Sequence, residues 1–419
     1  MKTRLFVLIW VIGSLLAGCT GQTGAQPTST AAPVANASST PIAIATSALT
    51  QAAATALPAT SVPATPTRAI TATPAPSATP QGWIGPDVFP PGINPLTGLQ
   101  VSRPELLDLP PAGISVTNFP VTARPQAGLS AAAQVYEFYV GIGMTRYLAV
   151  YYGDLPKVGT KTLTVGPIRS GRLPYEPIRN SLGGFLLIAN SYEGVVETLH
   201  NYNFLDSGST DVLSVFVDAA GIEKAAREYS VKLGKPPLTG NAFSVTPPDG
   251  GKDARMMWIP YSFLNQVIWR YDAASGAYQR YQDNYDGTTF IRLTDRLSAK
   301  PLAFQDVVVV FADHIAQQES LVEINLAEQA PQPALLLRDG KIYSIFWTTA
   351  RSGNKHIMRF IDSKQNPVPL KPGQTWVEVV STGSEVFETV DSPSYNDLHF
   401  KKPGSGNLEI NFIMPKPLR

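Results

Sequence analysis

The feature that most constrains the fold of this chain is a long segment that cannot form a core, from Thr20 to Gln81. The segment is built mainly from threonine, alanine, proline and serine, has no aromatic residue, and carries Arg68 as its one charged side chain. Such a composition buries too little apolar surface to offset the conformational entropy lost on folding. We therefore interpret residues 19–82 as a disordered tether, and we place the start of folded structure at Trp83.

The amino terminus, MKTRLFVLIWVIGSLLAGCTG, has the pattern of an export signal. Lys2 and Arg4 precede an apolar run that is long enough for a signal-peptide core and short for a membrane-spanning helix. Small residues then lead to Cys19, as in the bacterial lipobox, where the cysteine is lipidated and becomes the new N-terminus. We predict that residues 1–18 are a lipoprotein signal peptide and that Cys19 is the lipidation site. The alternative is a free thiol in an uncleaved apolar segment.

Composition restricts the partners of the exported part. Cys19 is the only cysteine of the chain, which excludes internal disulfides and cysteine metal clusters. Removal of residues 1–18 takes away Lys2 and Arg4, so 33 − 2 = 31 basic side chains face 32 acidic ones. This balance argues against a nucleic-acid partner. Because no later apolar run is long enough to span a bilayer, we expect a protein held by its lipid on the extracytoplasmic face of the cell membrane.

The first folded part, residues 83–240, alternates β-rich apolar runs with helix-like segments. The runs at Ile114–Asn118, Arg146–Tyr152 and Phe185–Asn190 are typical of buried strands. The segment GIEKAAREYSVKLG places apolar side chains at helical spacing. Strands that alternate with helices indicate an α/β domain with a mixed sheet and flanking helices.

The second folded part, residues 241–419, begins within a segment rich in turn residues, Lys235–Gly251. It contains a series of short apolar runs, such as DVVVVFAD, PALLLRDGKIYSIFWTT and TWVEVV, with turn signals such as Asp339-Gly340 among them. Little of this part has helical periodicity. The pattern predicts a mostly antiparallel β domain.

The same two parts contain a series of motifs in a characteristic order. In the first part they are NPLTGL, ARPQAGLSAAAQVYE, GMTRYLAVYY and VGPIRSGR, and in the second YDAASGAYQRYQDN, DVVVVF, DGKIYSIFW and LKPGQTWVEVV. Together they resemble the YerB-like bacterial lipoproteins, a family of unknown function with an N-terminal and a C-terminal domain. The resemblance covers nearly all of Asn94–Val380. It implies a lipid-anchored extracytoplasmic protein of two domains, and it supplies no established catalytic residue.

The chain departs from the family pattern at two polar positions. The resemblance implies an aspartate before Asn118, where this chain has Thr117. It also implies a histidine in a small-residue turn, where this chain has Asn190-Ser191-Tyr192. If these positions form a reaction centre in relatives, that centre is lost or changed here, which lowers the expectation of an enzyme.

The strongest candidates for a functional site are four arginines in the family-like segments: Arg124, Arg146, Arg169 and Arg172. Arginine binds carboxylates and phosphates through two parallel hydrogen bonds, so arginines that converge would form an anion site. The alternative is that each of them pairs with a local carboxylate such as Glu137 or Glu176, or caps a carbonyl. Glu137 is also the candidate general acid or base, and a structural role as the partner of Arg146 is its alternative.

Other site chemistries find little support. None of the four histidines has a zinc-like spacing, and Ser170 lacks both a nearby histidine in the sequence and a Gly-x-Ser-x-Gly elbow. Gly141 and Gly143 lack the third glycine and the following helix of a phosphate-binding loop, and they fit a hairpin turn better. We therefore predict neither a metal nor a cofactor.

These observations favour a lipid-anchored envelope protein that binds or scaffolds a cell-wall glycan, a peptide or an envelope protein. An alternative is an enzyme that acts on the cell wall or its glycopolymers, with the arginines around an anionic substrate. A third class, solute capture for a transporter, requires a deep cleft between the two parts. The arrangement of the arginines distinguishes the first two: they either share one open cleft with an unpaired carboxylate or lie in separate ion pairs.

Overall fold

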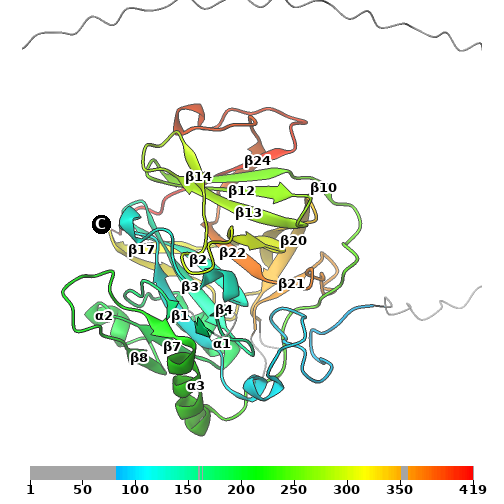
Figure 1. Ribbon diagram of the computed structural model, residues 1–419. Coiled ribbons are helices and arrows are strands. Elements are labelled where there is room, and N and C mark those ends of the chain that lie inside the picture. Colours follow the sequence, from blue (N-terminus) through cyan, green and yellow to red (C-terminus); the bar gives the residue numbers. More distant parts are fainter. Residues whose placement is uncertain (1–81, 159–160, 163, 351–356, 419) are drawn as a thin grey trace, which may run out of the picture. The chain divides into compact units, whose positions relative to one another are not determined.

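The computed structural model describes residues 82–158, 161–162, 164–350 and 357–418 (Figure 1). The predicted signal peptide, the predicted lipidation site at Cys19 and the predicted tether up to Gln81 lie outside these residues. Among the helices that the structure describes, none is long and apolar enough to cross a membrane. The described residues all belong to one unit of the chain.

The largest element is one mixed sheet to which both parts of the sequence contribute strands. Its order is β10-β20-β19-β16-β22-β2-β3-β1-β7-β8, with β21 paired to β20. In this order the strands are β10 (Lys252–Asp253), β20 (Lys341–Thr348), β19 (Gln332–Arg338), β16 (Asp306–Ala312), β22 (Thr375–Ser381), β2 (Gln134–Gly141), β3 (Met144–Tyr151), β1 (Ala112–Thr117), β7 (Phe185–Ile188), β8 (Tyr202–Phe204) and β21 (Arg359–Ile361). Figure 1 shows the strands of both parts side by side in this sheet.

Strands β2 and β22 join the two parts of the sequence. They run parallel, and their register places Glu137 beside Glu378. Every residue of both strands is buried. Two carboxylates at this position cannot be hydrated, so they need partners from inside the protein.

Strands β2 and β3 form an antiparallel hairpin, and the turn contains Gly141 and Gly143 as predicted. Both glycines have positive φ, 99° and 69°, which favours glycine. A Cβ atom on Gly141 would also lie 1.9 Å from the carbonyl oxygen of Glu319. The turn therefore depends on glycine for its conformation and for its close approach to a neighbouring segment.

A second sheet, made of strands from the second part, packs on the first. Its order is β14-β13-β12-β11-β24-β23, with β15 paired to β13. The strands are β14 (Phe290–Arg292), β13 (Ala277–Asp283), β12 (Asn265–Asp272), β11 (Met256–Ser262), β24 (Asn407–Asn411), β23 (Glu385–Glu388) and β15 (Ala303–Phe304). Trp269 of this sheet lies against Trp376 of the first, with ring centroids 5.3 Å apart. The two sheets thus share one apolar core.

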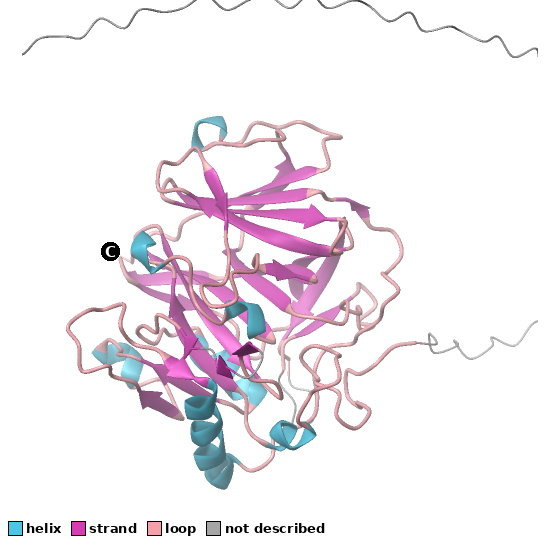
Figure 2. Cartoon of the chain, viewed as in Figure 1, coloured by secondary structure: helices cyan, strands magenta, loops and turns pink. Residues whose placement is uncertain are grey.

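The helices are few beside the strands (Figure 2). They are α1 (Tyr175–Leu182), α2 (Glu193–Val196) and α3 (Ala219–Leu233), with 3-10 helices η1 (Pro104–Asp108), η2 (Val121–Ala123), η3 (Leu129–Ala131) and η4 (Tyr395–Asp397). Pairs of short strands complete the described elements: β17 (His314–Gln318) with β18 (Leu321–Ile324), β4 (Lys157–Val158) with β5 (Lys161–Thr162), and β6 (Thr164–Val165) with β9 (Val217–Asp218). Asp218 caps the N-terminus of α3, because its carboxylate accepts a hydrogen bond from the Gly221 amide. The helix buries Ile222, Ala225 and Ala226.

The fold is therefore mostly β-sheet, and a layout in two parts is consistent with the prediction. The flanking helical layer expected of an α/β first domain is not clearly formed (Figure 2). One physical reason is that β2 and β3 pair directly through a tight turn, which leaves no crossover helix between them.

Candidate functional site

The register of the hairpin determines which of the predicted site residues can meet. Successive side chains of a strand point to opposite faces, and residues that pair directly share a face. Arg146 is opposite Phe138, whereas Glu137 is opposite Tyr147. Arg146 and Glu137 therefore lie on opposite faces of the sheet. For this reason the sequence-based alternative that made Glu137 the partner of Arg146 is wrong.

On the face that packs on the second sheet, two carboxylates share one guanidinium. Arg280 of β13 forms an ion pair with Glu137 at 2.7 Å and another with Glu378 at 3.0 Å. All three side chains are fully buried. Arg280 thus bridges one carboxylate from each part of the sequence, and we call these three residues the carboxylate bridge.

Neighbouring side chains add hydrogen bonds to the carboxylate bridge, while Glu137 Oε2 and Arg280 Nε have no hydrogen-bond partner in the structure. The Thr145 hydroxyl donates to Glu137 Oε1 at 2.6 Å. The indole N–H of Trp269 and the hydroxyl of Tyr261 donate to Glu378 at 2.7 and 2.9 Å. Each carboxylate therefore has an ionic partner and at least one neutral donor, which is the condition for a stable buried charge.

Burial affects the protonation of the carboxylate bridge. It raises the pKa of Glu378 well above the usual range, the negative charge of Glu137 raises it further, and Arg280 opposes both effects. The guanidinium of Arg280 also lies over the Trp376 ring, 4.4 Å from its centroid. Since Glu137 has no contact with solvent, the geometry gives it a structural role rather than that of an acid or base toward a substrate.

Arg124 lies apart from the other three predicted arginines. Its Nε donates to Asn118 Oδ1 at 3.1 Å, and its Nη1 donates to the carbonyl oxygen of Asp283 at 3.1 Å. The same Nη1 lies 3.9 Å from the Asp283 carboxylate. Burial lowers the pKa of Arg124 and raises that of Asp283. Arg124 therefore belongs to a local ion pair between the two parts of the sequence.

Arg146, Arg169 and Arg172 gather at one place in the first part, and we call them the arginine cluster. Arg146 is buried, with 4% of its surface exposed, and the other two are partly exposed. Burial together with the positive charges of Arg172 and Arg169 lowers the pKa of Arg146 to about 9. The three guanidiniums are thus close enough to repel one another.

Within the described residues no carboxylate forms an ion pair with the arginine cluster. The two acids considered as partners are engaged elsewhere, Glu137 with Arg280 and Glu176 with Arg179 at 2.6 Å. Four buried nitrogens of the cluster have no hydrogen-bond partner in the structure: Arg146 Nε, Arg146 Nη1, Arg169 Nε and Arg172 Nε. Arg169 Nη1 donates to the carbonyl oxygen of Val212 at 3.3 Å. The cluster is therefore rich in unused donors.

A loop of residues 166–174 brings Arg169 and Arg172 to the carboxyl end of strand β1. Strand β7 pairs in parallel only with the first half of β1, and the loop pairs with the rest. The amide of Arg169 donates to the carbonyl oxygen of Ser115, and the amide of Ala189 donates to that of Arg169. The loop thus fills the space where β7 diverges from β1. Ligand sites in parallel sheets lie at this end of the strands.

The position opposite Arg146 on β1 holds a neutral residue. Thr117 of β1 is directly opposite Arg146 of β3, so the two side chains share a face. The threonine hydroxyl donates to the carbonyl oxygen of Phe119 at 2.5 Å. An aspartate at position 117, which the family resemblance implies, would place a carboxylate beside Arg146. This chain has a neutral side chain there.

Sequence reasoning missed Arg280 and Glu378 as members of a polar site. Each is a charged residue inside a β-rich run, in GAYQRYQ and TWVEVV, and both are fully buried. A lone charge in such a run is a signal for a buried ion pair. The partner is not visible in the sequence, because the contact joins distant segments.

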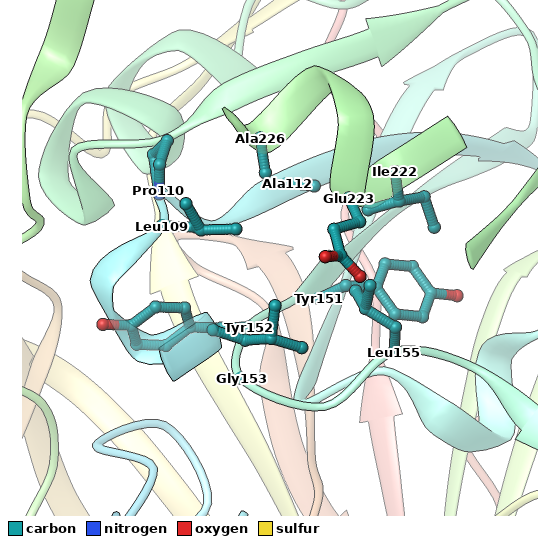
Figure 3. Close-up of a pocket in the computed structure, with 11 residues that line it drawn as sticks. Leu109, Pro110, Ala112, Tyr151, Tyr152, Gly153, Leu155, Ile222, Glu223 and Ala226 are labelled. Carbon is teal, nitrogen blue, oxygen red and sulfur yellow. The ribbon is translucent and has the colours of Figure 1, made fainter. Parts of the chain in front are cut away.

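A pocket lies between η1, the end of β3 and α3 (Figure 3). Its lining residues Ala112 and Tyr151 are at the opposite end of the β1–β3 pair from Arg146. It is lined mainly by apolar side chains, and its one charged lining residue is Glu223. This carboxylate already forms ion pairs with Arg103 and Arg227, each at 2.6 Å. Groups of histidine, cysteine, aspartate and glutamate suited to a metal ion are absent from the part of the chain that the structure describes. The arginine cluster is thus the stronger candidate for a ligand site.

Comparison with known proteins relates both parts of the chain to one family. Residues 96–229 match the model described as "Protein of unknown function (DUF3048) N-terminal domain", and residues 257–377 match "Protein of unknown function (DUF3048) C-terminal domain". A protein of Bacillus subtilis (strain 168) named "Putative lipoprotein YerB" is 26% identical over 309 residues, which cover 68% of this chain and 85% of that protein.

A solved structure has a similar fold. The crystal structure of the YerB protein from Bacillus subtilis aligns with a TM-score of 0.54 and 23% identity, and the alignment covers 68% of this chain and 95% of that chain. The arginine cluster lies within the segment that matches the N-terminal family model, and Arg280 lies within the segment that matches the C-terminal one. The chain belongs to the YerB-like family of two-domain proteins of unknown function.

Proposed function

We propose that this protein is a lipid-anchored protein of the bacterial envelope that binds an anionic group of a cell-wall component or envelope partner at its arginine cluster. The lipid anchor is supported by the sequence before Cys19 and by the similarity to a relative whose name describes a lipoprotein. The binding role is supported by the arrangement of Arg146, Arg169 and Arg172.

One observation carries the proposal: three guanidiniums lie together without a carboxylate partner among the described residues. A buried charge loses its hydration, and proteins normally compensate with an opposite charge and hydrogen bonds. The same molecule does so at Arg280. At the cluster a bound anion would supply both the missing charge and the missing acceptors.

The position of the cluster also suits binding. Arg169 and Arg172 are partly exposed, so solvent and solutes can reach them. Asn190 and Tyr192, in the segment that runs beside them, are exposed as well. The site therefore lies at the surface end of a parallel pair of strands, with the charge of Arg146 beneath it.

The enzymatic alternative receives no support from this geometry. It required the arginines and a carboxylate such as Glu137 to face one substrate. Glu137 lies on the other face of the sheet from Arg146 and is fully buried with Arg280. Binding is therefore the function that the site supports best.

Isothermal titration calorimetry of the full-length protein with sulfate, phosphate and acetate at constant ionic strength tests the proposal. We expect saturable binding of at least one anion by the wild type and loss of that binding in Arg169→Gln. Arg292→Gln is the matched control, since it removes an exposed arginine from β14, outside the cluster. Absence of binding in the wild type, or equal binding by Arg169→Gln, would contradict the proposal.

A further inference from the structure

We infer that the anion held by the arginine cluster is a phosphate group with about two negative charges or more, either a terminal phosphomonoester or a diphosphate. The inference rests on the proposed function and specifies its ligand. It is drawn from the charge of the cluster, from its free donors and from the residues beside it.

The charge of the cluster favours a multiply charged ligand. Its three guanidiniums carry three positive charges at neutral pH, since arginine stays protonated. A carboxylate brings a single negative charge, whereas a phosphomonoester carries about −1.5 to −2 near pH 7. The phosphate therefore offsets more of the repulsion among Arg146, Arg169 and Arg172.

The free donors also match a phosphate better than a carboxylate. Unpartnered buried nitrogens occur on all three side chains of the cluster, which come from two segments, β3 and the loop of residues 166–174. A carboxylate has two oxygens in one plane and pairs well with one or two guanidinium forks. A terminal phosphate has three oxygens in a tetrahedral arrangement, so each arginine can contact its own acceptor.

Ser191 is a further unpartnered donor, and it lies beside the loop that carries Arg169 and Arg172. Its hydroxyl is buried and has no hydrogen-bond partner. It lies against Gly171, because a Cβ atom built on that glycine would be 3.5 Å from Ser191 Oγ. Gly171 is the second residue after Arg169 and the one before Arg172, and its amide donates to the carbonyl oxygen of Asn190 at 2.8 Å. The segment with Ser191 therefore runs beside the loop that carries Arg169 and Arg172.

The experiment compares inorganic diphosphate, inorganic phosphate and acetate as ligands of the full-length protein. Isothermal titration calorimetry at about pH 7.5 and fixed ionic strength measures each affinity, because a phosphomonoester is then close to its dianionic form and charge screening is equal. We expect diphosphate and phosphate to bind roughly tenfold or more tightly than acetate, since charge-assisted bonds to a dianion are the stronger ones.

Two variants locate the binding at the cluster. Arg172→Gln removes one partly exposed charge, and we expect it to weaken diphosphate binding by roughly tenfold or more. Thr117→Asp places a carboxylate opposite Arg146, so the protein supplies its own anion and diphosphate binding should be lost. Arg292→Gln is the control and should bind like the wild type. Melting temperatures without ligand show that each variant is folded, and if Thr117→Asp does not fold, Arg172→Gln decides alone.

A phosphate of this kind can come from a soluble molecule, a wall polymer or a lipid headgroup, and further probes separate the sources. Poly(glycerol phosphate) presents phosphodiesters with one charge each and should bind more weakly than diphosphate. Phosphatidylcholine vesicles with phosphatidic acid present a lipid phosphomonoester. Binding to these vesicles that Arg172→Gln reduces would identify a lipid phosphate, whereas binding of diphosphate alone would identify a soluble one.

The outcomes separate this inference from the proposed function. If acetate binds as tightly as diphosphate, and Arg172→Gln weakens both, the site binds anions but the assignment to phosphate is wrong. A preference for the phosphodiester polymer over diphosphate would also overturn the assignment. If the wild type binds none of the anions, or if both variants bind like the wild type, the inference and the proposed function fail together.

Discussion

The carboxylate bridge and the arginine cluster lie against opposite faces of the same hairpin and have opposite surroundings. At the carboxylate bridge, Arg280 is shared by two carboxylates and lies over the ring of Trp376. At the arginine cluster, three arginines share no carboxylate among the described residues. Each charged member of the bridge has an opposite charge within the protein, and the cluster has none among the described residues. The bridge therefore serves the stability of the fold, and the unpaired charge of the cluster is what the proposed binding function rests on.

The largest effect is expected at the bridge. Arg280→Met would leave Glu137 and Glu378 buried side by side without the guanidinium that they share, and removing one partner of a buried ion pair costs about 3–5 kcal/mol. Urea denaturation should show this loss in the free energy of unfolding. Arg292→Met, at an exposed position, should change it by less than about 0.5 kcal/mol. A loss of similar size in both variants would remove the distinction between the two groups.

An arginine-to-methionine substitution at the cluster should change the free energy of unfolding in the opposite direction. Arg146→Met replaces a buried cation that has unpaired N–H groups with a flexible apolar side chain of similar length. We expect a gain of about 1–3 kcal/mol in the free energy of unfolding, because leaving such groups unsatisfied costs about that much. Calorimetry on the same sample should show that anion binding is lost. A strongly destabilised Arg146→Met protein would mean that Arg146 has a structural role like that of Arg280.

A smaller effect concerns pH. Burial raises the pKa of Glu378 from 4.5 to about 8, so the folded state retains a proton that the unfolded state releases between these values. The contribution to stability is therefore complete below about pH 4.5 and is lost as the pH rises toward 8. The glutamine of Glu378→Gln cannot titrate, so the free energy of unfolding of this variant should fall less steeply with pH than that of the wild type. The two slopes should differ by up to about 1.4 kcal/mol per pH unit. Urea denaturation at a series of pH values measures both slopes, and parallel curves would contradict the assignment.

The local structure around the cluster could be predicted from the sequence. The two glycines of GIGMTRY predict the hairpin turn, and pairing centred on Ile142 puts Arg146 opposite Phe138. The alternation of side chains then places Glu137 on the other face. The suggestion that these two residues pair failed because it used closeness in the sequence and not the register that the turn imposes.

The partners of the buried charges could not be predicted from the sequence. Arg280 meets Glu137 because β13 of one sheet packs on β2 of another, and no periodicity within either strand specifies that contact. The same holds for the cluster, where Arg169 reaches Arg146 through a loop inserted beside β1. Local patterns predict strands and turns, whereas the pairing of distant strands depends on the packing of the whole chain.

The parallel pairing of β2 with β22 has a consequence for folding during synthesis. Strand β2 ends at Gly141. Strand β22, which pairs with one edge of β2, ends at Ser381, much later in the chain. Until β22 has been synthesised, one edge of the apolar strand β2 has no partner. Such edges pair with strands of other molecules. A chain that stops before β22 would therefore be an aggregation hazard instead of a smaller working domain. Both parts must be present before this sheet is complete.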